Sequence, residues 1–153
     1  MDRELDATIE SVRVAGTPDG PVPVVVLTAA GEAEVLPIFI GFEEARSIAR
    51  GLEAEDVGRP MTHDLLLDVV EELGGRITEI VVDDLTDGTY TADLHLDTPR
   101  GETTLDARPS DSLALAARTD VPIRVDARVF EDGRRPPDEF EILDDIRDVA
   151  DLA

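Results

Sequence analysis

The sequence predicts a single α+β domain with a largely antiparallel or mixed β-sheet packed with helices. Three observations lead to this fold class. The first forty residues have strand-like patterns, two amphipathic helices follow, and a second, hairpin-rich set of strands precedes further helices. The length of 153 residues fits one domain. The hydrophobic content of 42%, with only 3% aromatic residues, predicts a core of aliphatic side chains.

The first half of the chain contains three predicted strands and two predicted helices. Alternating or Val-rich patterns predict strands over 8–14, 22–28 and 33–40, with Pro37 at an edge or bulge. Helical spacing of apolar residues predicts helices over 42–52 and 62–73. The second of these ends at Gly74-Gly75, a common helix stop.

The second half of the chain contains three predicted strands, followed by a helix, a further strand and a short helix. A hairpin is predicted from strands over 76–85 and 89–97, joined by the tight turn Asp87-Gly88, and a further strand is predicted over 102–107. A helix over 110–118, a strand over 122–125 and a short helix ending near Phe130 follow. We expect one domain over 1–132 and an acidic C-terminal extension over 133–153, with helical spacing between Phe140 and Leu152.

The charge is strongly acidic, with 36 acidic residues against 14 basic ones and a formal net charge of -22. All 14 bases are Arg. Acid excess, absent Lys and scarce aromatic residues are typical of halophilic proteins, because molar salt screens the self-repulsion. The surplus avoids residues 100–128, which are neutral overall, and collects in the tail. A neutral surface on an acidic protein is where an anion could approach; the weaker alternative is that it marks a core or a subunit interface.

Several function classes are disfavoured by what the sequence lacks. Without Cys, disulfides, thiolate catalysis and Cys-based metal sites are excluded. No run of apolar residues approaches the ~20 that a membrane span needs, and the N-terminus does not resemble a signal peptide. We therefore expect a cytoplasmic protein that does not bind membranes. No Gly-rich phosphate loop is present, and no organic cofactor is expected.

The composition also bears on oligomeric state. A Val-rich sheet with few aromatic residues predicts a homodimer.

Two short stretches share one design and supply the candidate site. Arg59-Pro60 precedes Thr62-His63-Asp64, and Arg108-Pro109 precedes Ser110-Asp111, each at the start of an apolar helix. We expect Thr62 and Ser110 to cap these helices, and the acidic residues to lie in their first turns. If the two helix starts face each other, a polar cluster forms that could bind phosphate or a metal ion. Its members are Arg59, His63, Asp64, Asp106, Arg108 and Asp111.

The residue types in this cluster indicate roles in binding and catalysis. Arg59 and Arg108 are fork-shaped donors suited to phosphate oxygens. His63 could act as a general base, because histidine titrates near neutral pH. Carboxylate oxygens prefer Mg²⁺ or Mn²⁺, and the predicted ligands are Asp64, Asp106 and Asp111. Each assignment has a structural alternative, in which His63 makes local contacts and each Asp pairs with its own Arg.

The motifs resemble those of the bifunctional nuclease family. The matching stretches are Leu36-Pro37-Ile38-Phe39-Ile40-Gly41, Arg59-Pro60-Met61-Thr62-His63-Asp64-Leu65 and Asp106-Ala107-Arg108-Pro109-Ser110-Asp111, and the resemblance covers roughly residues 5–132. It implies an α+β domain and an activity that cuts both DNA and RNA. Ser110 is among the matching positions and joins the arginines as a predicted substrate-binding residue.

The resulting prediction is a nuclease that hydrolyses phosphodiester bonds of DNA, RNA or both. In it, His63, Asp64 and Asp111 are catalytic, Arg59, Arg108 and Ser110 bind the substrate, and a divalent ion assists. The alternative is a non-enzymatic oligomeric module with a structural ion-pair network at the Arg-Pro motifs. Burial and mutual pairing of those residues would favour the module, and an open cleft with free carboxylate oxygens would favour the enzyme.

Overall fold

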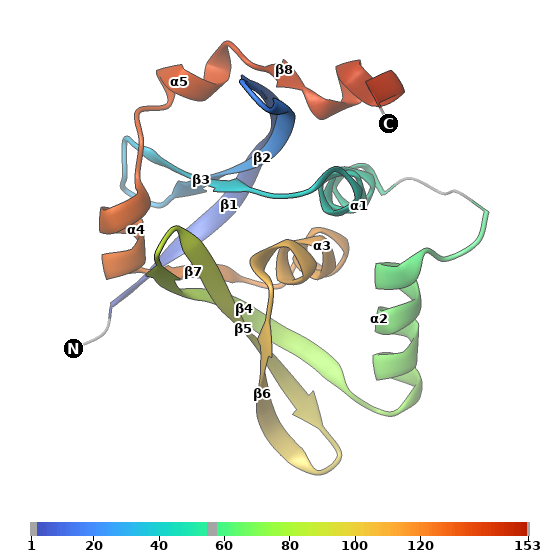
Figure 1. Cartoon of the computed structure of the whole chain (residues 1–153). Coiled ribbons are helices and arrows are strands. Elements are labelled where there is room, and N and C mark those ends of the chain that lie inside the picture. Colours follow the sequence, from blue (N-terminus) through green and yellow to red (C-terminus); the bar gives the residue numbers. More distant parts are fainter. Residues whose placement is uncertain (1–2, 55–57, 153) are drawn as a thin grey trace.

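The computed structural model describes residues 3–54 and 58–152 of the chain (Figure 1). These residues form one mixed sheet with helices, which confirms the predicted fold class. The elements, in chain order, are β1 (Glu4–Thr17), β2 (Gly20–Ala29), β3 (Val35–Phe39), α1 (Phe42–Glu53), α2 (Thr62–Glu72), β4 (Arg76–Thr86), β5 (Thr89–Thr98), β6 (Gly101–Ala107), α3 (Pro109–Thr119), β7 (Ile123–Asp126), α4 (Ala127–Gly133), α5 (Asp138–Glu141), β8 (Asp144–Asp145) and the 3-10 helix η1 (Ile146–Leu152).

The sheet is built from two antiparallel three-stranded units joined through one short strand. Its strand order is β3-β2-β1-β7-β4-β5-β6, and β8 pairs with β1 outside this path. Only the pairing of β4 with β7 is parallel. The hairpin between β4 and β5 turns at Asp87 and Gly88, both with positive φ, as the Asp-Gly sequence predicts. The sheet is therefore largely antiparallel, in agreement with the sequence.

A repeated unit of three strands followed by a helix organises the domain. Strands β1, β2 and β3 lead into α1, and strands β4, β5 and β6 lead into α3. The two helices pack side by side on one face of the sheet (Figure 1). Their close approach requires Gly51, because a Cβ at this position would lie 2.9 Å from both Ala117 Cβ and Arg118 Nη1. α2 follows α1 and has no counterpart after α3.

The main core lies between the sheet and the pair α1 and α3. It is aliphatic, as the composition predicts, and among its fully buried members are Val25, Leu27, Ile48, Ile80, Leu113 and Val125. α2 differs from the sequence prediction, since none of its residues is buried. Most of the apolar side chains that define its helical spacing are exposed. The face expected to pack into the core therefore points to solvent in the single chain.

The C-terminal segment crosses from one face of the sheet to the other. Phe140 and Leu143 cover Val24 and Val26 on the outer face of β2, whereas Ile146 and Val149 belong to the main core on the opposite face. One continuous helix cannot pack on both faces of the sheet. The apolar spacing that predicts a helix over 140–152 is therefore divided among α5, β8 and η1, which corrects the prediction.

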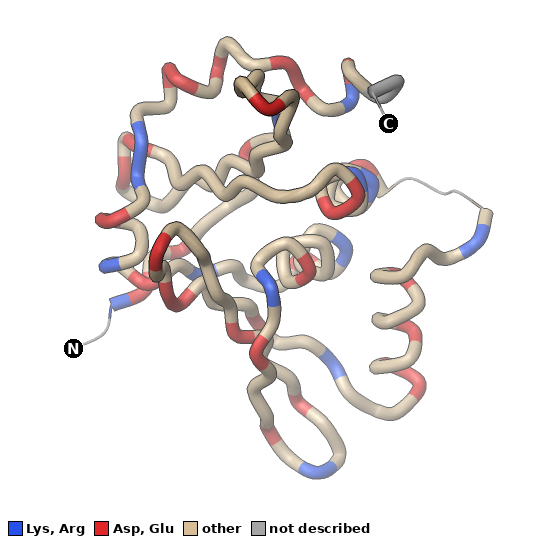
Figure 2. Tube along the Cα trace, viewed as in Figure 1, with Lys and Arg blue, Asp and Glu red and all other residues tan. Residues whose placement is uncertain are grey.

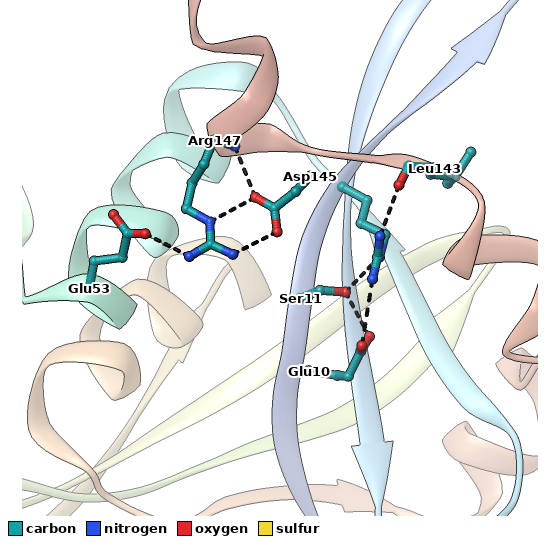
Figure 3. A network of polar contacts seen from close by, with 7 residues as sticks. Glu10, Ser11, Glu53, Leu143, Asp145 and Arg147 are labelled. Atoms are coloured by element: carbon teal, nitrogen blue, oxygen red, sulfur yellow. Dashed lines mark hydrogen bonds and ion pairs between the residues drawn. The ribbon is translucent and has the colours of Figure 1, made fainter.

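Polar contacts hold this segment to β1 and α1 (Figure 3). Arg13 Nη1 donates to the carbonyl of Leu143 at 2.8 Å. Arg147 bonds Asp145 through Nε at 2.9 Å and Glu53 through Nη1 at 2.7 Å. The hydrogen bonds from Arg147 hold the pKa of Asp145 below its ordinary range. The acidic tail is thus fastened by arginines at two places.

No helix among the described residues has the length and apolar character needed to cross a membrane. Acidic residues occur along most elements of the trace, including the C-terminal segment (Figure 2).

Candidate functional site

The first turns of α2 and α3 meet beside α1 and enclose a polar pocket of about 420 Å³. This confirms that the two predicted helix starts face each other. The lining residues come from all three helices and the segments just before them: Glu43, Glu44, Arg46, Ser47, Arg50, Met61, Thr62, His63, Arg108 and Asp111. The pocket therefore contains three of the sequence-predicted residues, His63, Arg108 and Asp111.

His63 lies at the centre of a chain of hydrogen bonds through the pocket wall. Its Nδ1 is 2.6 Å from Ser47 Oγ, and its Nε2 is 3.0 Å from Asp111 Oδ1. Both nitrogens of the imidazole ring therefore have a hydrogen-bond partner. The His63 side chain is 14% exposed, so its ring is largely enclosed but reaches the pocket.

Asp111 connects this imidazole to Arg108. Arg108 donates to it from Nε at 2.9 Å and from Nη2 at 3.2 Å, the fork geometry typical of Arg–carboxylate pairs. Burial acts to raise the pKa of Asp111, but the hydrogen bonds from Arg108 and His63 outweigh it. The pKa therefore lies below its ordinary value, and Asp111 is ionised at neutral pH. Its side chain is 37% exposed, so it remains accessible from the pocket.

A second ion pair lies behind the pocket. Arg118, near the end of α3, donates to Asp64 Oδ1 at 2.7 Å, to Ser47 Oγ at 3.2 Å and to the carbonyl of Ala114 at 2.7 Å. The Arg118 side chain is only 8% exposed. Burial acts to raise the pKa of Asp64, but the bonds from Arg118 and from the Met61 backbone N–H keep it below its ordinary value. This pair ties the first turn of α2 to α3.

Two arginines of α1 complete the pocket. Arg46 and Arg50 are four residues apart and therefore lie on one face of the helix. Within the described residues, neither forms an ion pair, and the buried Nε of Arg50 has no hydrogen-bond partner. Together with Arg108 they balance the three carboxylates of the pocket, Glu43, Glu44 and Asp111. The pocket is thus neutral in a chain of net charge -22, and two of its cations are available to an anion.

Other sequence-predicted residues lie elsewhere. Arg59 is exposed and is not part of the pocket wall. Asp106 pairs with Asp93 across β5 and β6, on the face of the sheet opposite the helices. Ser110 is 5% exposed and lines a neighbouring pocket with Arg108. Among the described residues, no group of three or more suitable side chains could hold a metal ion, so the set Asp64, Asp106 and Asp111 is not brought together.

The predicted caps also need correction. α2 begins at Thr62, as predicted, but Met61 is the residue before its first turn, and α3 begins at Pro109 after Arg108, one residue earlier than predicted. The hydroxyl groups of Thr62 and Ser110 therefore lie inside the helices and are not caps. At α2, Asp64 accepts from the Met61 N–H at 3.0 Å and satisfies that donor instead. At α3, Pro109 occupies the first helical position, which suits its fixed φ.

Sequence reasoning missed four residues around the pocket: Arg46, Ser47, Arg50 and Arg118. Two spacings could have indicated them. Arg46 and Arg50 lie one helical turn apart, and Asp111 and Arg118 lie seven residues apart, close to two turns. Ser47 carries no signal of its own, because a single serine on an apolar helix face is more often a packing residue.

Comparisons with known proteins show the family of this chain. A sequence profile of the bifunctional nuclease domain matches residues 25–137, which is more than half of the chain. The chain belongs to the bifunctional nuclease domain family. Uncharacterized proteins from two strains of Mycobacterium tuberculosis are 42% identical over 120 residues, which are 78% of this chain and 71% of each relative.

A more distant similarity reaches a plant protein. Bifunctional nuclease 2 of Oryza sativa subsp. japonica is 26% identical over 120 residues, which cover 75% of this chain but only 37% of the rice protein. Every pocket residue of this family member falls within the matched range 25–137. The C-terminal segment from α5 onward lies beyond it.

Proposed function

We propose that this bifunctional nuclease domain hydrolyses phosphodiester bonds of DNA, RNA or both in the pocket between α1, α2 and α3. The observation that supports this most is the His63–Asp111 pair on the same wall as Arg46, Arg50 and Arg108. The name of the rice relative, Bifunctional nuclease 2, points to the same activity. The proposal includes nucleic acid as the partner, a cytoplasmic location and a homodimer, as the sequence predicts.

The arginines supply the binding and electrostatic part of this reaction. Arg46 and Arg50 would receive the scissile phosphate, because both line the pocket and neither forms an ion pair at contact distance among the described residues. Arg108 bonds Asp111 through Nε and Nη2 and keeps other donors for a phosphate oxygen. Such donors, aimed at the developing charge, stabilise a transition state better than water does.

The His63–Asp111 pair would handle the proton. Water attacks phosphorus, the pair accepts the proton that this water loses, and the leaving oxygen receives a proton in return. Ser47 accepts from Arg118 and bonds Nδ1 of His63, so it fixes the orientation of the ring. Ser47 is 5% exposed, which favours a positioning role over a nucleophilic one.

Divalent metal assistance remains a prediction that the donor set does not favour. Asp64 is bound by Arg118, Asp111 is shared by Arg108 and His63, and Asp106 lies across the sheet. No step is therefore assigned to a metal ion. Cleavage in Mg²⁺, in Mn²⁺ and in EDTA tests the point directly.

The decisive experiment is cleavage of labelled single- and double-stranded DNA and RNA, at low and at molar KCl. His63→Gln and Asp111→Asn should lower the rate by about 10²–10⁴-fold, the usual contribution of general acid–base catalysis. Arg46→Ala should weaken binding and slow cleavage.

The chain offers matched controls for the arginine and the aspartate variants. Arg59→Ala also removes an arginine and Asp106→Asn also removes a carboxylate, but both positions lie outside the pocket and should cut like wild type. Equal effects of Asp111→Asn and Asp106→Asn would contradict the assignment of the pocket.

One observation favours the alternative of a non-enzymatic module. Asp64, one of the predicted catalytic residues, is engaged in an ion pair whose arginine is almost fully buried. The Asp64–Arg118 part of the polar network is therefore structural. If a folded protein cuts no nucleic acid under any of these conditions, the module becomes the better description of the whole domain.

A further inference from the structure

Helix α2 presents an apolar ridge that the single chain leaves uncovered. Leu65, Leu66, Val69 and Leu73 are between 43% and 72% exposed, and no residue of α2 is buried. In an ideal helix these four side chains fall within an arc of about 100°. We call them the α2 ridge. An isolated helix of 11 residues is marginal in water, so most of its stability must come from packing.

A groove lies directly beside the ridge. It has a volume of about 640 Å³ and runs between the end of α2 and the hairpin of β5 and β6. Its apolar walls come from Val70, Leu73, Leu96 and Pro99. We call it the hairpin groove. Strand β6, which forms the far side of this hairpin, is an edge strand with unpaired backbone groups on its outer side.

Charged residues border both the ridge and the groove. Asp68 and Glu72 flank the ridge on one side of α2, whereas Glu71 lies on the opposite side of the helix. The acidic residues of α2 are marked in Figure 2. Arg100 and Glu102 line the groove. Arg76 is 74% exposed and forms an ion pair with Asp97 at 3.8 Å, whereas Arg100 has no ion pair within the part of the chain that the structure describes.

We propose that this face binds a second copy of the chain, with the α2 ridge of each copy in the hairpin groove of the other. A two-fold axis makes the same patch serve both partners, which requires a protrusion and a complementary recess side by side. Placing the ridge in the groove also brings Glu72, at the edge of the ridge, toward the unpaired Arg100. The four ridge side chains expose on the order of 400 Å², about half of the ~800 Å² that each partner contributes to a standard interface. The groove walls and charged borders supply the rest.

The dimer has a consequence for the site, because α2 also carries His63. The contacts that hold the first turn of α2 in place are polar: His63 with Ser47 and Asp111, and Asp64 with Arg118. Covering the ridge fixes the rest of the helix and so holds the His63 ring against Asp111. The second copy is thus a positioning partner for His63. This inference deepens the homodimer of the proposed function, and it does not rest on the proposed nuclease activity.

The interface is tested by light scattering and sedimentation of the full chain from micromolar to millimolar concentration. Wild type should be dimeric. Leu66→Glu and Leu73→Glu should weaken the dimer at least about tenfold, as loss of a central interface residue does. Ile142→Glu is the control, because Ile142 is 84% exposed but lies on the C-terminal segment. A monomeric wild type would assign the ridge to a different protein, and a dimer unaffected by both ridge variants would place the interface elsewhere; either result overturns the proposal.

The effect on the site is read from imidazole nitrogen NMR signals, without any cleavage assay. The chain has two histidines, and His95, on β5 near Thr104 and Glu79, serves as the internal reference. Dilution of wild type below its dimerisation constant should shift the His63 signals and leave those of His95 unchanged. Leu66→Glu, with a far-ultraviolet spectrum like that of wild type, should give the diluted spectrum at every concentration. His63 signals that stay constant through dissociation would refute the coupling.

Discussion

Replacing Arg118 by leucine tests whether the buried ion pair behind the pocket holds α2 to the domain. The substitution removes bonds to Asp64, Ser47 and the Ala114 carbonyl at 2.7, 3.2 and 2.7 Å. Removing one partner of a buried pair costs about 3–5 kcal/mol, chiefly because the other charge is left unpaired. Asp64 is 39% exposed and regains water, so we expect about 2–3 kcal/mol. For a protein of this size that lowers Tm by roughly 5–10 °C.

The assay is urea unfolding followed by circular dichroism, together with a thermal scan. Arg147→Leu is the matched control, since Arg147 also bonds two carboxylates but is 58% exposed, and it should change stability little. Adding Asp64→Asn to Arg118→Leu should recover part of the loss, because no unpaired charge then remains. The reasoning is refuted if Arg118→Leu is no more destabilising than Arg147→Leu, or if the double variant is as unstable as the sum of its parts.

Three further predictions concern charge. The pKa of Asp111 lies below its ordinary value, so its contribution to stability is complete above about pH 4 and is lost as pH falls further; urea midpoints from pH 6 downward should decline less steeply in Asp111→Asn. Burial and the neighbouring Asp83 raise the pKa of Asp93, which means that its ionised form opposes folding at neutral pH. Asp93→Asn should therefore raise Tm at pH 7 and give no gain at low pH, and an equal gain at both pH values would argue for a packing effect. Finally, the net charge of -22 predicts that Tm rises with KCl toward molar concentration, and a Tm independent of salt would contradict the predicted halophilic adaptation.

The local patterns of the sequence were sufficient for most of the fold. The Asp-Gly turn at Asp87-Gly88, the helical spacing after Gly41 and the Val-rich strand β2 each follow from short-range chemistry, and all appear as predicted. The tail was harder, because its apolar residues belong to two faces of the sheet. The exposure of the α2 ridge could not be predicted either, because helical spacing shows that one face of a helix is apolar and does not show what covers that face.

The candidate site was predictable where it depends on helix starts. The Arg-Pro motifs located His63, Arg108 and Asp111, which meet in the pocket. Asp106 could not be assigned correctly, because strand alternation decides its side of the sheet, and one residue of register reverses it. The α1 residues Arg46 and Arg50 depend on how α1 packs on α3, a contact set by Gly51 and invisible in any short motif.

The path of the C-terminal segment affects the order in which parts of the domain can fold during synthesis. β1 is synthesised well before two of its partners, since it pairs with β7 over 123–126 and with β8 at Asp144–Asp145. Both faces of the first sheet unit are also closed by side chains between Phe140 and Val149. A nascent chain on the ribosome can therefore form the β1–β2–β3 unit and cover one of its faces with α1, but the outer face of β2 stays uncovered until Phe140 and Leu143 have been synthesised. The abundant carboxylates give this partly folded chain a negative charge, which opposes its association with other nascent chains.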